Sequence, residues 1–320
     1  YRVSMMKLLF IADPLEDLKI EKDTTLAMML AGQKASHVIY FGKAQTLHST
    51  RAQVQILAQR LEINLTQSPW YKIVSESVED LVNFDAVLMR QDPPFSVEYL
   101  TNTWLLSQAE RVGAKVFNSP TALREHSEKV AILEFAKWIT PTLITRSLAQ
   151  IKDFHQLYQD IVIKPLDGMG GMGIFRVGPD GTNLASIVET LGQNGERSLM
   201  AQRYLSEIKD GDKRLLLING KPVPFVLARI PQKGDIRGNL AAGGIGQARP
   251  LGPTEIAIAN ELGPELVRRG LFLVGVDIIG SHLTEINVTS PTCFVEITQQ
   301  TGFDVAKFWL EELEMQIMRG

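Results

Sequence analysis

From its start to about residue 126, the chain alternates strand-like and helix-like hydrophobic patterns. Apolar runs such as "KLLFIAD" (7–13) and "FDAVLMR" (84–90) predict buried strands, and apolar residues at helical spacing predict helices over 24–36 and 96–113. This alternation is typical of an α/β domain whose helices cover a mostly parallel sheet, and we place that domain at residues 1–127. Residues 45–75 have a weaker pattern and predict only short strands.

From about residue 128 the predicted strands come in pairs, which favours an α+β second domain over 128–320. The clearest pair is "RLLLING" with "KPVPFVLARI", joined at Asn219-Gly220, a strong signal for a tight hairpin. A second pair consists of "LFLVGVDII" (271–279) and "HLTEINVT" (282–289). Helices are predicted around "TEIAIANELGPELVRRG" and "DVAKFWLEELEMQIM".

Two glycine-rich segments interrupt the second domain. The first, "IVIKPLDGMGGMGIFRVG", contains the string G-x-G-x-x-G at Gly168, Gly170 and Gly173. A dinucleotide-binding site requires a helix directly after the glycines, but β-forming residues follow here, so we interpret 167–173 as a flap between two strands. The second segment, 231–250, has five glycines and little apolar periodicity, which is typical of an active-site lid; the alternative is a disordered surface loop.

Asp277, Glu285 and Asn287 are expected to converge on the second strand pair. Glu285 and Asn287 are two residues apart on one strand and therefore share a face. An odd number of loop residues centred on Ser281 would place Asp277 opposite Glu285 on that face. Two carboxylates about 4 Å apart repel by roughly 4 kcal/mol at a surface-like dielectric, which indicates a bound cation. Oxygen ligands suit Mg²⁺, and the alternative is a solvated strand face without a ligand.

Lys164 lies on the strand-like segment "IVIKPL", where apolar residues on both faces predict burial. A lysine is rarely buried without an anionic partner, and a phosphate beside the flap would supply one. The alternative is a lysine that extends to solvent from a flexible hairpin. A protein-kinase site is excluded because the lysine precedes the glycines and no H-R-D or D-F-G motif follows. Four further charges, each taken alone, suit a charged surface better than a ligand site: Asp212, Lys213, Arg214 and Arg229.

Composition narrows the function classes further. A net charge of −3 over 320 residues provides no field that would attract nucleic acid or an anionic membrane. Cys293 is the only cysteine, so no internal disulfide can form, and we expect a cytoplasmic protein. No apolar run reaches the roughly 18 residues of a membrane span. The histidines lack metal-ligand spacing, and neither G-x-S-x-G nor a Walker A motif occurs.

The combination of a lysine strand, a glycine flap and a distal D…E-x-N cluster resembles the ATP-grasp superfamily. Within it, the chain is similar to the prokaryotic-type glutathione synthetases, and five motifs spread over nearly the whole length carry the likeness: "MRQDPPF", "IVIKPLDGMGG", "DGDKRLLL", "RGNLAAGG" and "LTEINVTSPT". The resemblance implies an N-terminal parallel-sheet α/β domain followed by an ATP-grasp domain. It also implies a cytoplasmic homo-oligomer, with a tetramer expected.

The chemistry that the resemblance implies joins γ-glutamylcysteine to glycine while ATP is cleaved to ADP and phosphate. The dipeptide carboxylate attacks the γ-phosphate, and the glycine amine then displaces phosphate from the acyl phosphate. The implied nucleotide site consists of Lys129, Lys164, Gly168, Gly170, Gly171, Gln202, Tyr204, Leu205 and Asp212. The implied catalytic residues are Arg214, Arg229, Arg237, Gly238 and Asn239.

The resemblance also assigns metal and peptide ligands. Asp277, Glu285 and Asn287 would hold Mg²⁺, with Mn²⁺ as an alternative ion, against the β- and γ-phosphates. Arg90 and Ser290 would bind the peptide. Two other interpretations stay open: a different ATP-grasp carboxylate–amine ligase, or a non-catalytic ATP–Mg²⁺ binding module that regulates a partner.

Overall fold

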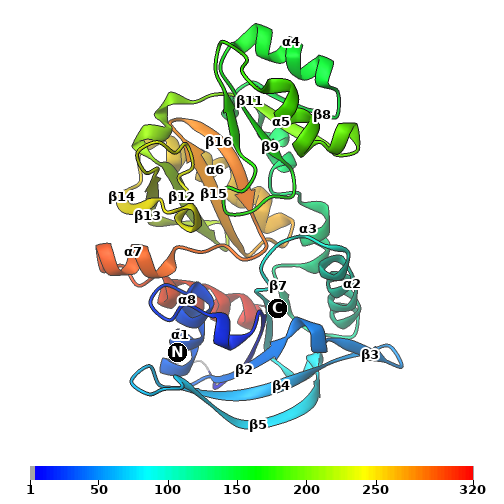
Figure 1. Ribbon diagram of the computed structural model, residues 1–320. Coiled ribbons are helices and arrows are strands. Elements are labelled where there is room, and N and C mark those ends of the chain that lie inside the picture. The colour runs from blue at the N-terminus through cyan, green and yellow to red at the C-terminus, as the bar shows by residue number, and fades with distance from the viewer. Residues whose placement is uncertain (1–3, 320) are drawn as a thin grey trace.

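The computed structural model describes residues 4–319 and stacks three β-sheets into an elongated molecule (Figure 1). The first sheet has the strand order β3-β4-β2-β1-β6-β7, with β5 paired to β4. Its strands are β1 (Lys7–Ala12), β2 (Val38–Lys43), β3 (His48–Thr50), β4 (Gln53–Ile63), β5 (Tyr71–Asp80), β6 (Ala86–Met89) and β7 (Val116–Phe117). Its helices are α1 (Thr24–Lys34), α2 (Val97–Arg111) and α3 (Pro120–Glu125).

The apolar runs of the N-terminal half form the parallel part of this sheet, as predicted. Strand β1 pairs in parallel with β2 and β6, and β6 pairs in parallel with β7. The expectation of only short strands in 45–75 is wrong, because β4 has 11 residues and β5 has 10 and they form a long antiparallel hairpin. Most of β5 is exposed on both faces, so its sequence lacks the alternation that marks a half-buried strand.

The second sheet is four-stranded, in the order β10-β9-β11-β8, and carries the flap. Strands β9 (Ile161–Pro165) and β10 (Phe175–Val177) flank the glycines, which confirms a flap between two strands. Ile161 and Ile163 of β9 pack into the core under α4 (Leu148–Tyr158) and α5 (Leu184–Leu191). The alternate residues Val162 and Lys164 therefore face the opposite side. The remaining strands are β8 (Thr142–Thr145) and β11 (Leu199–Arg203).

The third sheet has the order β14-β13-β12-β15-β16 and forms the floor of the candidate site. Its strands are β12 (Asp212–Ile218), β13 (Lys221–Ile230), β14 (Ile245–Pro250), β15 (Leu273–Ile279) and β16 (His282–Asn287), with α6 (Pro253–Arg268) packed against it. The hairpin at Asn219-Gly220 is confirmed, and both residues have the positive φ that a tight two-residue turn requires. Since β14 pairs along β13, the expected lid over 231–250 is wrong for its last six residues, and 231–244 is the irregular part.

The C-terminal helices return to the N-terminal sheet. After α7 (Phe294–Thr301), α8 (Val305–Arg319) lies beside α1, and Trp309 of α8 packs 6.2 Å from Phe10 of β1 between ring centroids. The expected second domain included this helix, but its buried side chains belong to the core under β1. Among the described residues, no helix combines the length and apolar character that crossing a membrane would require.

Candidate active site

A cavity of about 320 Å³ lies between the flap-bearing sheet and the five-stranded sheet. All the predicted site residues except Arg90 and Asp277 line it. The flap contributes Gly168, Gly170 and Gly171, and the lid contributes Arg237, Gly238 and Asn239. Gln202, Tyr204 and Leu205 form the wall at the end of β11. The structure thus brings together segments that are far apart in the sequence.

The floor of the cavity is a row of charges across neighbouring strands. Arg214 of β12 stands directly opposite Asp277 of β15, which in turn stands opposite Glu285 of β16. Opposed residues share a face, so all three side chains lie on the cavity side of the sheet. Gly275 makes room for this arrangement, because a Cβ there would meet Arg214 Cδ at 3.0 Å.

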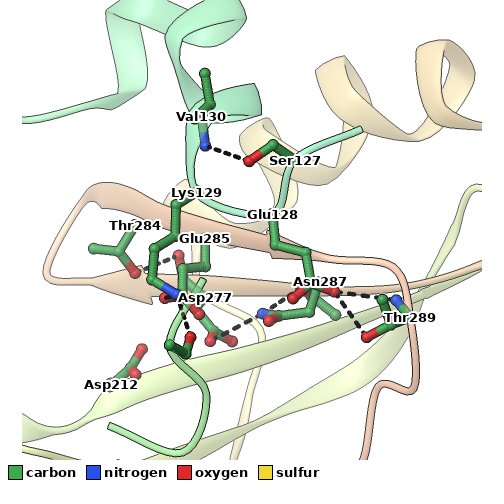
Figure 2. Close-up of polar contacts among 12 residues, drawn as sticks. Ser127, Glu128, Lys129, Val130, Asp212, Asp277, Thr284, Glu285, Asn287 and Thr289 are labelled. Atoms are coloured by element: carbon green, nitrogen blue, oxygen red, sulfur yellow. Dashed lines mark hydrogen bonds and ion pairs between the residues drawn. The ribbon is translucent and has the colours of Figure 1, made fainter. Parts of the chain in front are cut away.

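The convergence of Asp277 with Glu285 is confirmed, but the predicted odd loop count is wrong. Ile279 pairs with His282, so the turn contains only Gly280 and Ser281. A register shift next to Asp277 restores the pairing, since one extra residue, Thr284, is inserted into β16 there. The Thr284 hydroxyl donates to the Asp277 carbonyl at 3.1 Å (Figure 2).

Asp277 is held by arginines rather than facing the cavity. Arg214 donates from Nε and Nη2 to its two oxygens at 2.5 and 3.0 Å, and Arg229 Nη2 lies 2.9 Å from Oδ2. Asn287 Nδ2 adds a further hydrogen bond at 3.1 Å. Burial alone would raise the pKa of Asp277, but the charges of Arg214 and Arg229 hold it well below its usual range.

The pKa of Asp212, on the same floor, shifts in the opposite direction to that of Asp277. Arg229 Nη2 lies 2.6 Å from Asp212 Oδ2, while Oδ1 is buried and has no hydrogen-bond partner among the described residues. Burial raises the pKa of this carboxyl to about 6, because one arginine does not compensate for the loss of solvent and for the negative charges of Asp277 and Glu285. Asp212, which lines the cavity, therefore keeps one acceptor oxygen without a donor among the described residues.

Lys129 and Lys164 lie on the roof side of the charged floor. Lys129 Nζ lies 3.2 Å from Glu285 Oε1 and donates to the Gly168 carbonyl of the flap at 2.6 Å; Figure 2 shows its side chain pointing towards Glu285. Lys164 is buried, as predicted from its strand. Burial lowers the pKa of Lys164, and the nearby Glu285 opposes that shift.

Arg90 does not reach the cavity. It is 6% exposed, and it donates from Nε to the Thr25 hydroxyl at 3.0 Å and from Nη2 to the Pro291 carbonyl at 2.9 Å. These two contacts support the loop after Asn287. Arg90 Nη1 has no hydrogen-bond partner among the described residues, and the expected contact of Arg90 with the peptide stays a prediction. Ser290 of that loop does line the cavity and donates to Asp92 Oδ1 at 2.5 Å.

Sequence reasoning missed Glu128 and Asp92, which also line the cavity. Glu128 Oε1 accepts hydrogen bonds from the Val288 and Thr289 N–H groups at 2.9 and 3.1 Å and from the Thr289 hydroxyl at 3.0 Å (Figure 2). Asp92 falls within the motif "MRQDPPF" and was available to sequence reasoning. Glu128 has no such signal, because its partners lie some 160 residues further along the chain.

Within residues 4–319, no three His, Cys, Asp or Glu side chains are grouped so that they could hold a metal ion. The D…E-x-N set supplies only two carboxylates, and one of them, Asp277, is already neutralised by arginine. Glu285 and Asn287 remain at the cavity surface. Asn287 Nδ2 is used by Asp277 and the Gly275 carbonyl, which leaves its Oδ1 for another partner.

Comparison with known proteins gives matches along nearly the whole chain. The family model for the N-terminal domain of prokaryotic glutathione synthetase matches residues 6–124, and the model for its ATP-grasp domain matches residues 128–302. A glutathione synthetase of Ralstonia nicotianae is 52% identical over 309 residues, covering 97% of this chain and 95% of that protein. One from Escherichia coli O6:H1 is 42% identical over 315 residues, covering 98% and 100%.

Solved structures with the same fold are more distant in sequence. The D-cycloserine synthetase DcsG superposes with a TM-score of 0.68 at 16% identity, covering 97% of this chain and 99% of that one. The ATP-grasp ligase PsnB, solved with a minimal precursor, gives a TM-score of 0.62 at 14% identity, covering 97% and 99%. At this identity the likeness shows the ATP-grasp fold alone.

Proposed function

We propose a glutathione synthetase reaction for this chain, because the chain belongs to the prokaryotic glutathione synthetase family. In this reaction the protein ligates γ-glutamylcysteine to glycine and cleaves ATP to ADP and phosphate. The observation that carries the proposal is the cavity between the flap and the charged floor. It brings Lys129, Lys164 and Arg229, from separate elements, around one space. A triphosphate is the kind of ligand that such converging cations stabilise.

The residues present fit a Mg²⁺ site with two protein ligands. Glu285 and the free Oδ1 of Asn287 would hold the ion, and phosphate oxygens and water would complete its shell. When bound, Mg²⁺ neutralises the negative charge that develops on the β- and γ-phosphates. We assign Asp277 to orienting Arg214 and Arg229, since its own oxygens are already taken by those two side chains.

The chain's own residues account for the remaining requirements. Lys164 would contact phosphate from β9, and Lys129 would exchange its contact with Glu285 for one with phosphate. Arg214 and Arg229, fixed in place by Asp277, would stabilise the charge on the reacting carboxylate and on the transferred phosphoryl group. The dipeptide carboxylate attacks the γ-phosphorus and ADP leaves. The glycine amine then attacks the acyl carbon and phosphate leaves.

The flap and the lid would keep water from the acyl phosphate. Their tips lie close together, since a Cβ added at Gly170 would be 3.4 Å from Ala241 Cβ. Excluding solvent favours attack by the amine over hydrolysis. Arg237, Gly238 and Asn239 would complete the cover from the lid side.

The test is an ADP-release assay with ATP, Mg²⁺, γ-glutamylcysteine and glycine, in which each component is omitted in turn. We expect ADP and the tripeptide to form together only when both γ-glutamylcysteine and glycine are present. Ligation of a different carboxylate and amine, without formation of the tripeptide, would point to another ATP-grasp ligase. ATP binding without turnover on any such pair would point to a non-catalytic module and contradict the proposal.

A further inference from the structure

Arg176 lies outside the cavity, yet it touches a residue that lines it. It belongs to β10, the strand after the flap, and pairs in register with Val162 of β9, which pairs with Gln202 of β11. Opposed residues share a face of a sheet, so Arg176 lies on the face from which Val162 and Gln202 meet the cavity.

The guanidinium of Arg176 is stacked on Tyr204. Its Cζ lies 3.7 Å from the centroid of the Tyr204 ring, well within the range of a cation–π contact. Tyr204 follows β11 and forms part of the cavity wall. A planar guanidinium stacked on this ring limits the orientations that the ring can adopt.

Asp160 holds both members of the stack. Its two oxygens accept from Arg176 Nε at 2.9 Å and from Arg176 Nη2 at 2.7 Å, and its main-chain carbonyl accepts from the Tyr204 N–H at 2.9 Å. The side chains of Arg176 and Asp160 are 41% and 28% exposed, so the ion pair adds little to stability by itself. Its geometric effect is larger, because it fixes the guanidinium in the plane that covers the ring.

We propose that Arg176 is a positioning residue for the nucleotide: with Asp160 it orients the Tyr204 ring in the cavity wall and connects that wall to the strand after the flap. The inference rests on the proposed use of ATP in this cavity. Neither the sequence motifs nor the expected site included Arg176. The part of the nucleotide concerned is the base, since Lys164 pairs with Met200 near the start of β11, whereas Tyr204 and Leu205 follow the end of that strand.

The test compares Arg176→Met with the parent. Methionine keeps an unbranched stem and removes the guanidinium. We expect the Kd for ADP, measured by calorimetry with Mg²⁺, and the KM for ATP to rise by roughly 3- to 30-fold, the effect of losing one stacked cation. The KM for the dipeptide and kcat at saturating ATP should stay close to the parent values. Arg268→Met is the matched control, because it removes a forked pair with Glu265 on the exposed side of α6.

A double-mutant cycle shows whether Arg176 acts through Tyr204. In the Tyr204→Leu background, Arg176→Met should weaken ADP binding no further, since the ring that it positions is gone. Losses that multiply, or an ADP affinity that Arg176→Met leaves unchanged, would overturn the proposal. If Arg176→Met fails to fold, Arg176→Lys, which keeps a cation but not the fork, replaces it in the same cycle. ADP binding requires no ligation, so the result is independent of whether the proposed reaction occurs.

Discussion

Individual side chains of the site are tuned by the charges beside them, and the same residue type behaves differently at two neighbouring positions. Asp277 has two arginine partners and a lowered pKa, whereas Asp212 has one arginine and a pKa raised to about 6. Lys164 is buried among groups of both signs, and its pKa is lowered. The direction of each shift thus follows from burial and from the number and sign of the charges beside the group.

The first prediction concerns Lys164. Replacing it with alanine removes one charge-assisted contact and should weaken ATP binding by roughly 10- to 150-fold. Isothermal titration with a non-hydrolysable ATP analogue measures the change. Lys137→Ala serves as the control, because Lys137 pairs with Glu261 and is 64% exposed on the surface. Equal affinities for Lys164→Ala and the parent would rule out a phosphate contact.

A second prediction tests the contact between flap and lid at Gly171. Its φ is +82°, and a Cβ there would meet Asn239 Oδ1 at 2.8 Å and Arg237 Cδ at 3.2 Å. Gly171→Ala should therefore hold the flap and lid apart, lower the rate of ligation and raise the fraction of ATP hydrolysed without peptide formation. The ratio of ADP to tripeptide measures this uncoupling.

Gly302→Ala is the matched control for that experiment. Gly302 also has a positive φ, +76°, but nothing lies within 4 Å of its added Cβ. The two variants therefore share the backbone strain of a left-handed alanine and differ in the steric contact. Similar uncoupling in both would show that strain, and not the flap–lid contact, is responsible.

At the scale of elements, sequence patterns predicted buried strands and missed exposed ones. The runs that became β1 and β6 are nearly continuous apolar segments, and a strand that is buried on both faces is easily recognised from such a segment. Strand β5 carries mixed polar and apolar residues on two exposed faces and has no readable period. A hydrophobic pattern reports burial, so an exposed strand that is held by main-chain pairing stays hidden.

The candidate site could be predicted where it lies within short motifs and could not where it depends on pairing across strands. Glu285 and Asn287 share a face of the strand because they are two residues apart, so their placement could be predicted from the sequence. The ion pairs of Asp277 depend on the register of β12, β13 and β15, which local sequence does not encode. For the same reason the sequence did not indicate the partners of Arg90, because Thr25 and Pro291 come from distant segments.

The third prediction concerns the irregular part of the lid, residues 231–244. Trypsin should cleave the free protein after Lys233 or Arg237, and ATP, Mg²⁺ and γ-glutamylcysteine together should slow that cleavage, because closure shields the segment. Cleavage at Arg51, on the exposed tip between β3 and β4, provides an internal control that ligands should not change. Protection of both sites to the same degree, or of neither, would contradict a lid that closes over the bound substrates.

At the scale of the whole molecule, the N-terminal sheet and the five-stranded sheet are joined by buried polar contacts as well as by the return of α8. Asn118, just after β7, donates from Nδ2 to the carbonyls of Leu273 and Val288 at 2.9 and 2.8 Å and accepts from the Leu273 N–H at 2.8 Å. His126, between α3 and Lys129, lies in the same junction and is 5% exposed. The junction thus carries a titratable side chain in a buried position.

The last prediction follows from the protonation of His126. Burial, with the charge of Arg269 nearby, lowers the pKa of His126 to about 4. In the unfolded chain His126 has an ordinary pKa of about 6.5, so between pH 6.5 and 4 the unfolded chain binds a proton at this residue and the folded chain does not. The residue therefore stabilises the fold above pH 6.5 and loses that contribution as the pH falls towards 4. The loss amounts to about 3 kcal/mol in the free energy of unfolding.

Urea unfolding of the parent between pH 7.5 and 4.5 should show the decline, and His126→Gln, which cannot titrate, should show a shallower one. His48→Gln, which removes an exposed imidazole, is the control. If His126→Gln and the parent lose stability equally over this range, His126 is not the group responsible for the acid sensitivity of the junction.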